Sequence, residues 1–156
     1  MGLFKFLPKA ERFCWCTRNL KCASFIIIFM GMISSIITSA ILCKPVCKEL
    51  YNVSSPIKLP VNILRWILFT SEMLLLASAF AFLLGIFWSI RITADIFIVS
   101  ILLKCFLTIL YASLIIVQEH YAHCRWYNTQ IFNLIVYTIM WCYFVIIINA
   151  YEGQIE

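Results

Sequence analysis

The chain has 156 residues, of which 64% are hydrophobic and only 12% charged, with a formal net charge of +5. Soluble domains use roughly 45–50% apolar and about 25% charged residues, so this composition excludes an ordinary water-soluble protein. The segments outside the apolar stretches are short, and none is long enough to bury a core in water. The sequence therefore predicts a single membrane domain over residues 1–156, without a separate soluble module.

Four uninterrupted apolar stretches dominate the chain: Ala23–Leu42, Trp66–Ile90, Ile92–Val117 and Ile131–Ala150. About 20 helical residues, rising 1.5 Å each, cross the roughly 30 Å of hydrocarbon in a bilayer. Each stretch reaches that length. We therefore predict an all-α membrane protein, a bundle of four transmembrane helices joined by short loops.

The arm before the first span, residues 1–22, is basic. Its positive side chains are Lys5, Lys9, Arg12, Arg18 and Lys21, and the only acidic residue among them is Glu11. Basic residues flanking a first span tend to stay on the cytoplasmic side of the membrane. We therefore predict a cytoplasmic arm, and four spans return the C-terminus to the same side.

Cys14 and Cys16 lie in this arm, and Cys22 lies at the membrane boundary. Disulfides rarely persist in the reducing cytosol. Juxtamembrane cysteines beside basic and aromatic residues are acceptors for reversible palmitoylation. We treat the three thiols as lipidation candidates, with unmodified interfacial cysteine as the alternative reading. A C-x-C pair lacks the second ligand pair that a tetrahedral zinc site needs.

The residues around these cysteines resemble those of a known family. Phe13-Cys14-Trp15-Cys16 is followed by Leu20-Lys21-Cys22-Ala23, which leads into Ile26-Ile27-Ile28. This pattern resembles the cysteine cluster and Leu-Arg-x-Gly sequence that open the first helix of small insect tetraspan proteins, a group that includes the Pasiflora septate-junction proteins. It is also similar to the cluster of the lysosome-associated four-transmembrane proteins. The resemblance implies a tetraspan protein with cytoplasmic termini that works at cell junctions.

The first outer loop contains the sequon Asn52-Val53-Ser54. A sequon with a non-proline middle residue is an acceptor for N-glycosylation in the secretory lumen. Asn52 is therefore a glycosylation candidate, and its position agrees with the predicted orientation.

Three cysteines fall on the predicted outer side: Cys43, Cys47 and Cys124. An oxidising compartment favours a disulfide there. Either a local Cys43–Cys47 bridge or a bridge from one of these two to Cys124 is compatible with the sequence. The nearby histidines, His120 and His123, do not lead us to predict a metal site, and we expect no cofactor.

Small residues recur every fourth position in the first two spans. The first set is Gly31, Ser35 and Ser39, and the second is Ala77, Ala81, Gly85 and Ser89. Helices in lipid associate through close backbone approach rather than apolar burial, and rows of small side chains permit that approach. We therefore predict that these rows bring spans one and two together.

Three ionisable residues fall within the spans: Glu72, Asp95 and Lys104. Each costs about 2.5–3.5 kcal/mol on insertion scales, so such residues have a structural or functional reason. Asp95 lies four residues after Arg91, which marks the inner turn, and the two are placed to pair. Glu72 and Lys104 allow two interpretations: an ion pair that sets helix register, or a proton or ion relay.

No catalytic constellation is visible, and we predict a protein that is not an enzyme. The expected function is a tetraspan scaffold in the plasma membrane, at a cell junction, or in an endosomal membrane. It would act by lateral association with membrane lipids and with other integral membrane proteins or itself, and without nucleic acid. The alternative is a small transporter or channel accessory subunit that uses Glu72 and Lys104.

Overall fold

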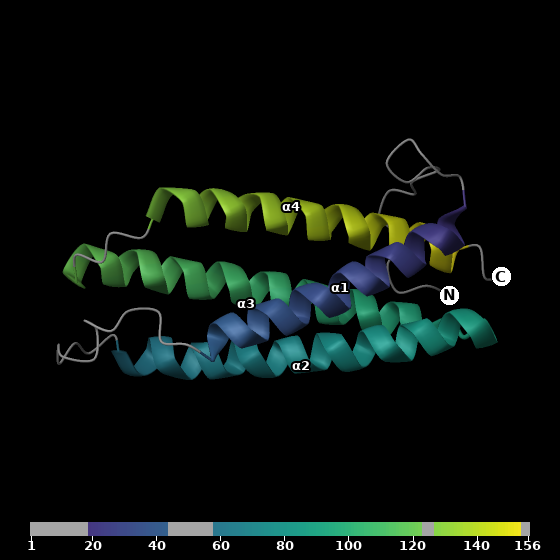
Figure 1. Cartoon of the computed structure of the whole chain (residues 1–156), viewed down its shortest axis with the longest axis horizontal. Helices are drawn as coiled ribbons and strands as arrows, with labels where there is room; N and C mark the ends of the chain where they lie inside the picture. Colours follow the sequence, from purple (N-terminus) through teal and green to yellow (C-terminus); the bar gives the residue numbers. More distant parts are fainter. Residues whose placement is uncertain (1–18, 44–57, 123–126, 154–156) are drawn as a thin grey trace.

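The computed structural model describes residues 19–43, 58–122 and 127–153, and this part of the chain is helical with no strand. Its helices are α1 (Leu20–Leu42), α2 (Lys58–Trp88), α3 (Ile92–Ala122) and α4 (Tyr127–Glu152). All four are long and apolar enough to cross a membrane. The predicted fold class, an all-α bundle of four membrane-spanning helices, is confirmed (Figure 1).

The helices form a ring in which each one packs on the next. α1 lies against α2, α2 against α3, α3 against α4, and α4 against α1. α1 crosses the bundle obliquely, close to α4 where α1 begins and close to α2 where it ends (Figure 1). α1 begins and α4 ends at the same end of the bundle, as four crossings require (Figure 1).

All four helices are longer than the apolar stretches that predicted them, and the two longest are α2 and α3. α2 begins at Lys58 rather than Trp66, and α3 continues to Ala122 rather than Val117. At 1.5 Å per residue, 31 residues reach about 46 Å, well beyond the hydrocarbon core. Pro60 does not prevent the early start of α2. N–H groups in the first turn of a helix have no intrahelical acceptor, so the N–H that proline lacks is not needed there. Hydropathy detects the membrane-embedded part of a helix rather than the whole helix.

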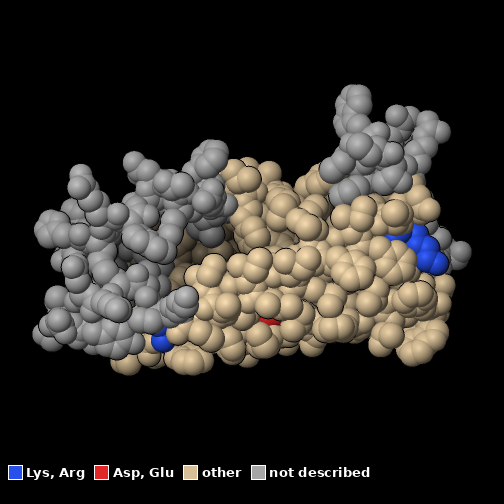
Figure 2. Space-filling view, in the orientation of Figure 1, with Lys and Arg blue, Asp and Glu red and all other residues tan. Residues whose placement is uncertain are grey.

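The outward surface of the bundle is apolar. Large side chains such as Phe29, Ile36, Phe87 and Phe106 are more than half exposed. Figure 2 shows that lysine and arginine appear only near the two ends of the described surface on this face, with an almost uncharged stretch between them. A patch of this size is unfavourable in water but matches lipid chains. The chain is thus a multi-pass integral membrane protein.

A tight turn joins α2 to α3. α2 ends at Trp88, Ser89 has a left-handed backbone with φ of 55°, and the N–H of Ile90 donates to the carbonyl of Gly85 at 2.9 Å. This is the Schellman arrangement that terminates many helices. Ser89 therefore lies outside α2 and is not part of its packed row of small residues, which corrects the sequence prediction.

Replacing Ser89 by glycine should stabilise the protein by about 0.5–1 kcal/mol. A left-handed residue other than glycine costs roughly 1–2 kcal/mol, partly offset by the greater freedom of glycine in the unfolded chain. Thermal unfolding in detergent measures the change. The control Ser113→Gly lies within α3, where glycine weakens a helix, so its midpoint should fall. A fall for Ser89→Gly as well would contradict the expectation.

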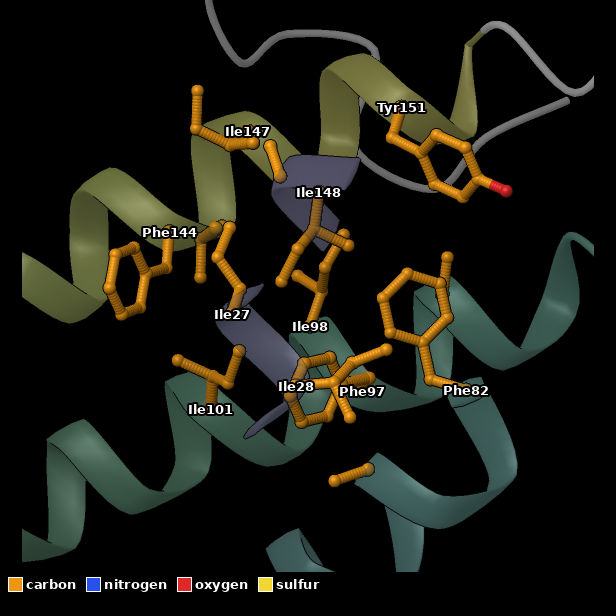
Figure 3. Packing of buried hydrophobic residues seen from close by; sticks show 14 of the residues in the cluster. Ile27, Ile28, Phe82, Phe97, Ile98, Ile101, Phe144, Ile147, Ile148 and Tyr151 are labelled. Carbon is orange, nitrogen blue, oxygen red and sulfur yellow. The ribbon is translucent and has the colours of Figure 1, made fainter. Parts of the chain in front are cut away.

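Two apolar clusters fill the interior. The larger one lies toward the end with the α2–α3 turn, where side chains of all four helices converge, among them Ile28, Phe82, Phe97 and Ile148 (Figure 3). The smaller cluster contains Leu42, Val61, Leu64, Leu68 and Tyr111. On α2, Leu68 belongs to one cluster and Leu75 to the other, so the residues between them, including Glu72, occupy a separate layer.

Candidate functional site

The layer between the two apolar clusters contains an ion pair. Nζ of Lys104 on α3 lies 2.8 Å from a carboxylate oxygen of Glu72 on α2, and the two side chains are 1% and 0% exposed. The sequence allowed either an ion pair or a proton or ion relay, and the structure shows the direct contact that an ion pair requires. Each charge would be costly in this low-dielectric interior, and the close opposite charge offsets part of that cost.

A tyrosine of α4 extends the ion pair to the other two helices. Nζ of Lys104 donates a hydrogen bond to the hydroxyl oxygen of Tyr137 at 2.7 Å, and the Tyr137 and Ser34 hydroxyls are hydrogen-bonded to each other. An ammonium group can only donate, so Tyr137 accepts from it and its own O–H is available for Ser34. The resulting chain runs from Glu72 through Lys104 and Tyr137 to Ser34, across all four helices.

Two aromatic rings flank the ammonium group. Nζ of Lys104 lies 5.1 Å from the centre of the Tyr137 ring and 5.0 Å from that of Trp141. Cation–π contacts at this range are worth about 2 kcal/mol or more when they are desolvated. Trp141 is fully buried. The Trp141 ring and the Tyr137 hydroxyl thus supply part of the solvation that lysine loses on leaving water.

The predicted row of small residues on α1 faces the interior. Gly31, Ser35 and Ser39 are all buried. A Cβ on Gly31 would lie 3.2 Å from the Trp141 ring, so this glycine faces α4 rather than α2. The Ser35 hydroxyl lies beside the Glu72 carboxylate. This row therefore lets α1 approach the charged layer closely.

The predicted row on α2 does not form one packed face. Gly85 is buried, but Ala81 is half-buried and Ala77 is exposed. Gly85 contacts α3 instead of α1, since a Cβ there would lie 1.9 Å from Oγ1 of Thr93. The buried side of α2 holds Ser71, Glu72, Leu75, Ser78, Ala79 and Phe82. Small size alone did not identify this face, because larger side chains also fill it.

A second ion pair closes the end of the bundle at the α2–α3 turn. Nε of Arg91 donates to Glu152 of α4 at 2.6 Å, and the Glu152 side chain is 2% exposed. Sequence spacing favoured Asp95 as the partner, but the structure brings Arg91 to Glu152. Asp95 is half-buried and its Oδ1 has no hydrogen-bond partner. The bond joins residues 61 positions apart, a contact that local spacing does not reveal.

The remaining candidate residues lie apart from the charged layer. Cys22 is exposed near the start of α1, where Asn19 caps the helix, and Cys43 is an exposed free thiol directly after its end. Five candidates fall outside the described residues: Cys14, Cys16, Cys47, Asn52 and Cys124. Within the described residues, no group of three or more His, Cys, Asp or Glu side chains is placed to hold a metal ion.

Sequence reasoning missed Tyr137, Ser34, Trp141 and Glu152. Tyrosine and serine are ordinary in membrane helices, so neither marks a site by itself. The spacing of Tyr137 and Trp141 by one helical turn was the available signal, since residues four apart share a helix face. Their contact with Lys104 could be identified only once the rotation of α3 about its axis was known.

The charged layer can hold helices in register, because its bonds draw on all four of them. Its ammonium and carboxylate groups bind each other. Comparison of the chain with protein-family models, with curated proteins and with solved structures finds no match in any of the three.

Proposed function

We propose that this protein is a non-enzymatic tetraspan scaffold that works by lateral association within a membrane. The observation that carries the proposal is the Glu72–Lys104 pair, which is closed inside the bundle and bonded onward to Tyr137 and Ser34. Buried polar contacts of this kind are well suited to fixing register. The charges of Glu72 and Lys104 thereby bind each other within the chain, and the outward face is left to other partners.

The apolar outer face supports association with lipids, with other integral membrane proteins or with a second copy. Exposed side chains line each helix, including Ile33 on α1, Leu84 on α2, Val99 on α3 and Ile139 on α4. In lipid, such a face gains nothing from burial alone, and selective contacts come from shape and packing. We therefore expect partners with complementary transmembrane helices rather than soluble ligands.

The location proposed for the scaffold is the plasma membrane, at a cell junction, or an endosomal membrane. The junction assignment rests on the resemblance of the N-terminal cysteine segment to the Pasiflora-like tetraspan proteins. The basic arm supports cytoplasmic termini. Imaging of a tagged copy, combined with pull-down from gently solubilised membranes, tests the assignment. Recovery of integral membrane partners at a junction supports it, and a purely intracellular reticular location with no partner contradicts it.

A transporter or channel accessory subunit is the second candidate. The observation in its favour is that Ser35 and Ser39 of α1 and the indole N–H of Trp141 are buried without hydrogen-bond partners. Buried polar groups of this kind, of which Ser35 lies beside Glu72, are compatible with an ion or proton path.

Glu72→Gln separates the two functions. A scaffold should keep its partner recovery within about twofold, because glutamine retains the shape and the acceptor oxygen that faces Lys104. A transporter should lose flux in proteoliposomes almost completely, because coupling needs the carboxylate. Wild-type protein and empty liposomes are the references. Flux that depends on Glu72 with undiminished assembly would overturn the scaffold proposal.

Acylation of the cytoplasmic arm is a further part of the proposal. Thiols, basic residues and aromatic residues cluster in the sequence around Cys14 and Cys16, just before the first span, a pattern typical of acylated juxtamembrane segments. Acyl exchange should label wild type strongly and lose most of its signal in the Cys14→Ser, Cys16→Ser double variant. Cys105→Ser, within α3, is the matched control and should keep full labelling. Equal signal from wild type and the double variant would remove the idea.

A further inference from the structure

Arg65 is a half-buried cation of α2, in the half of the helix away from the α2–α3 turn. Its guanidinium carbon lies 5.7 Å from the centre of the Trp66 ring, and its Nε is buried without a hydrogen-bond partner. α2 carries one carboxylate, that of Glu72, which lies two turns away and is already bound by Lys104. In the described part of the chain, no carboxylate forms an ion pair with Arg65.

Tyr111 of α3 places a hydroxyl group beside this cation. α2 and α3 run in opposite directions, and Glu72 faces Lys104 across their interface. Seven residues are nearly two full turns, so the same register brings Arg65 level with Tyr111. The charge of Arg65 acts on the Tyr111 hydroxyl, as expected for groups that lie close together. That hydroxyl is buried and has no hydrogen-bond partner.

Both groups lie at the height of the lipid headgroups. Counted from Ser89 in the α2–α3 turn, Arg65 is about 24 residues, or about 36 Å, along the axis of α2. The hydrocarbon core is about 30 Å thick, and the headgroup layers extend the bilayer to about 40–45 Å. With the turn at one edge of the core, Arg65 lies about 6 Å beyond the other edge. Trp66 is more than half exposed there, as is common for aromatic residues at a membrane interface.

We infer that Arg65 and Tyr111 form a binding site for a phosphate group, at the membrane face opposite the α2–α3 turn. A guanidinium group presents parallel N–H donors that match two oxygens of a phosphate. A buried hydroxyl without a partner is costly, and a further phosphate oxygen would supply the acceptor that Tyr111 lacks. Phospholipids hold their phosphate in this layer. The inference goes beyond the scaffold proposal and stands whether or not that proposal holds.

Native mass spectrometry of the full chain, released from maltoside micelles, tests the site. Micelles are doped with dioleoylphosphatidylcholine or with dioleoylglycerol, which has the same chains and no phosphate. Wild type should retain the phosphatidylcholine about tenfold more strongly. Arg65→Gln should weaken that retention by about tenfold, the effect of losing hydrogen bonds to a charged group, and Tyr111→Phe by about threefold.

Lys58→Gln is the matched control. Lys58 is an exposed residue two turns before Arg65, so the variant loses the same charge at the same end of α2 and should keep retention within about twofold. Arg65→Lys keeps the charge without the parallel donors and should bind about threefold more weakly than wild type. It keeps the inference testable if Arg65→Gln does not fold.

Inorganic phosphate distinguishes the two sources of the ligand. Retention of phosphatidylcholine but not of inorganic phosphate identifies a lipid headgroup, and retention of both identifies a site for phosphate from either source. Equal retention of phosphatidylcholine and dioleoylglycerol by wild type would overturn the site, because the phosphate would then contribute nothing. Equal losses in Arg65→Gln and Lys58→Gln would overturn it as well, since net charge alone would explain the binding.

Discussion

Replacing Gly85 by leucine should destabilise the bundle by about 3 kcal/mol or more. A Cβ at this position would lie 1.9 Å from Oγ1, 2.8 Å from Cβ and 3.0 Å from Cγ2 of Thr93. Rotating the threonine would not remove the contact with its Cβ, so α2 and α3 would have to separate beside their shared turn. Overpacking a close contact typically costs about 1–3 kcal/mol, and leucine adds three further carbons to it.

Ala77→Leu is the matched control for this substitution. Ala77 belongs to the same four-residue spacing as Gly85 but is exposed, so a leucine there should point into lipid and change stability by less than about 0.5 kcal/mol. Denaturant titration in mixed micelles and the monodisperse fraction in size exclusion measure both variants. Equal losses for the two would mean that spacing, rather than contact with Thr93, determines packing on α2.

Lys104→Leu should have a similarly large effect, about 3–5 kcal/mol of lost stability. The substitution leaves Glu72 fully buried without its cation and also removes the donor to Tyr137. Breaking a buried pair from one side is costly because the remaining charge has no compensation. The loss would be measured by the same titration, with unfolding followed by tryptophan fluorescence.

The double variant Glu72→Leu, Lys104→Leu provides the control that identifies the cause. Replacing both partners by apolar residues is often neutral or stabilising, so the double variant should recover most of the stability lost by Lys104→Leu. Glu72→Leu alone should be destabilised like the lysine variant, because it leaves a buried ammonium group. Additive losses in the double variant would contradict the ion-pair explanation and indicate that packing volume dominates.

Hydropathy by itself determined the fold class and the number of spans. In a bilayer every backbone polar group must be satisfied internally, so an apolar stretch of sufficient length has to be a helix. The same argument identified Glu72 and Lys104 as unusual, since charged residues within a span are costly. The reliance on hydropathy also explains why the predicted helix ends were less accurate than the predicted number of helices. Beyond the hydrocarbon, the start of α2 at Lys58 depends on local helix contacts that hydropathy does not report.

Only the tertiary structure decided how each helix is rotated about its axis. Lipid is as apolar as leucine, so most side chains of these helices have no strong preference between the interior and the membrane. Ala77 could therefore face outward and Gly85 could turn toward Thr93 although both fit one sequence pattern. The partners of the charged residues followed from the same rotations. Tyr137 reaches Lys104, and Glu152 rather than Asp95 reaches Arg91, because contacts between distant segments require all the helices to be in place.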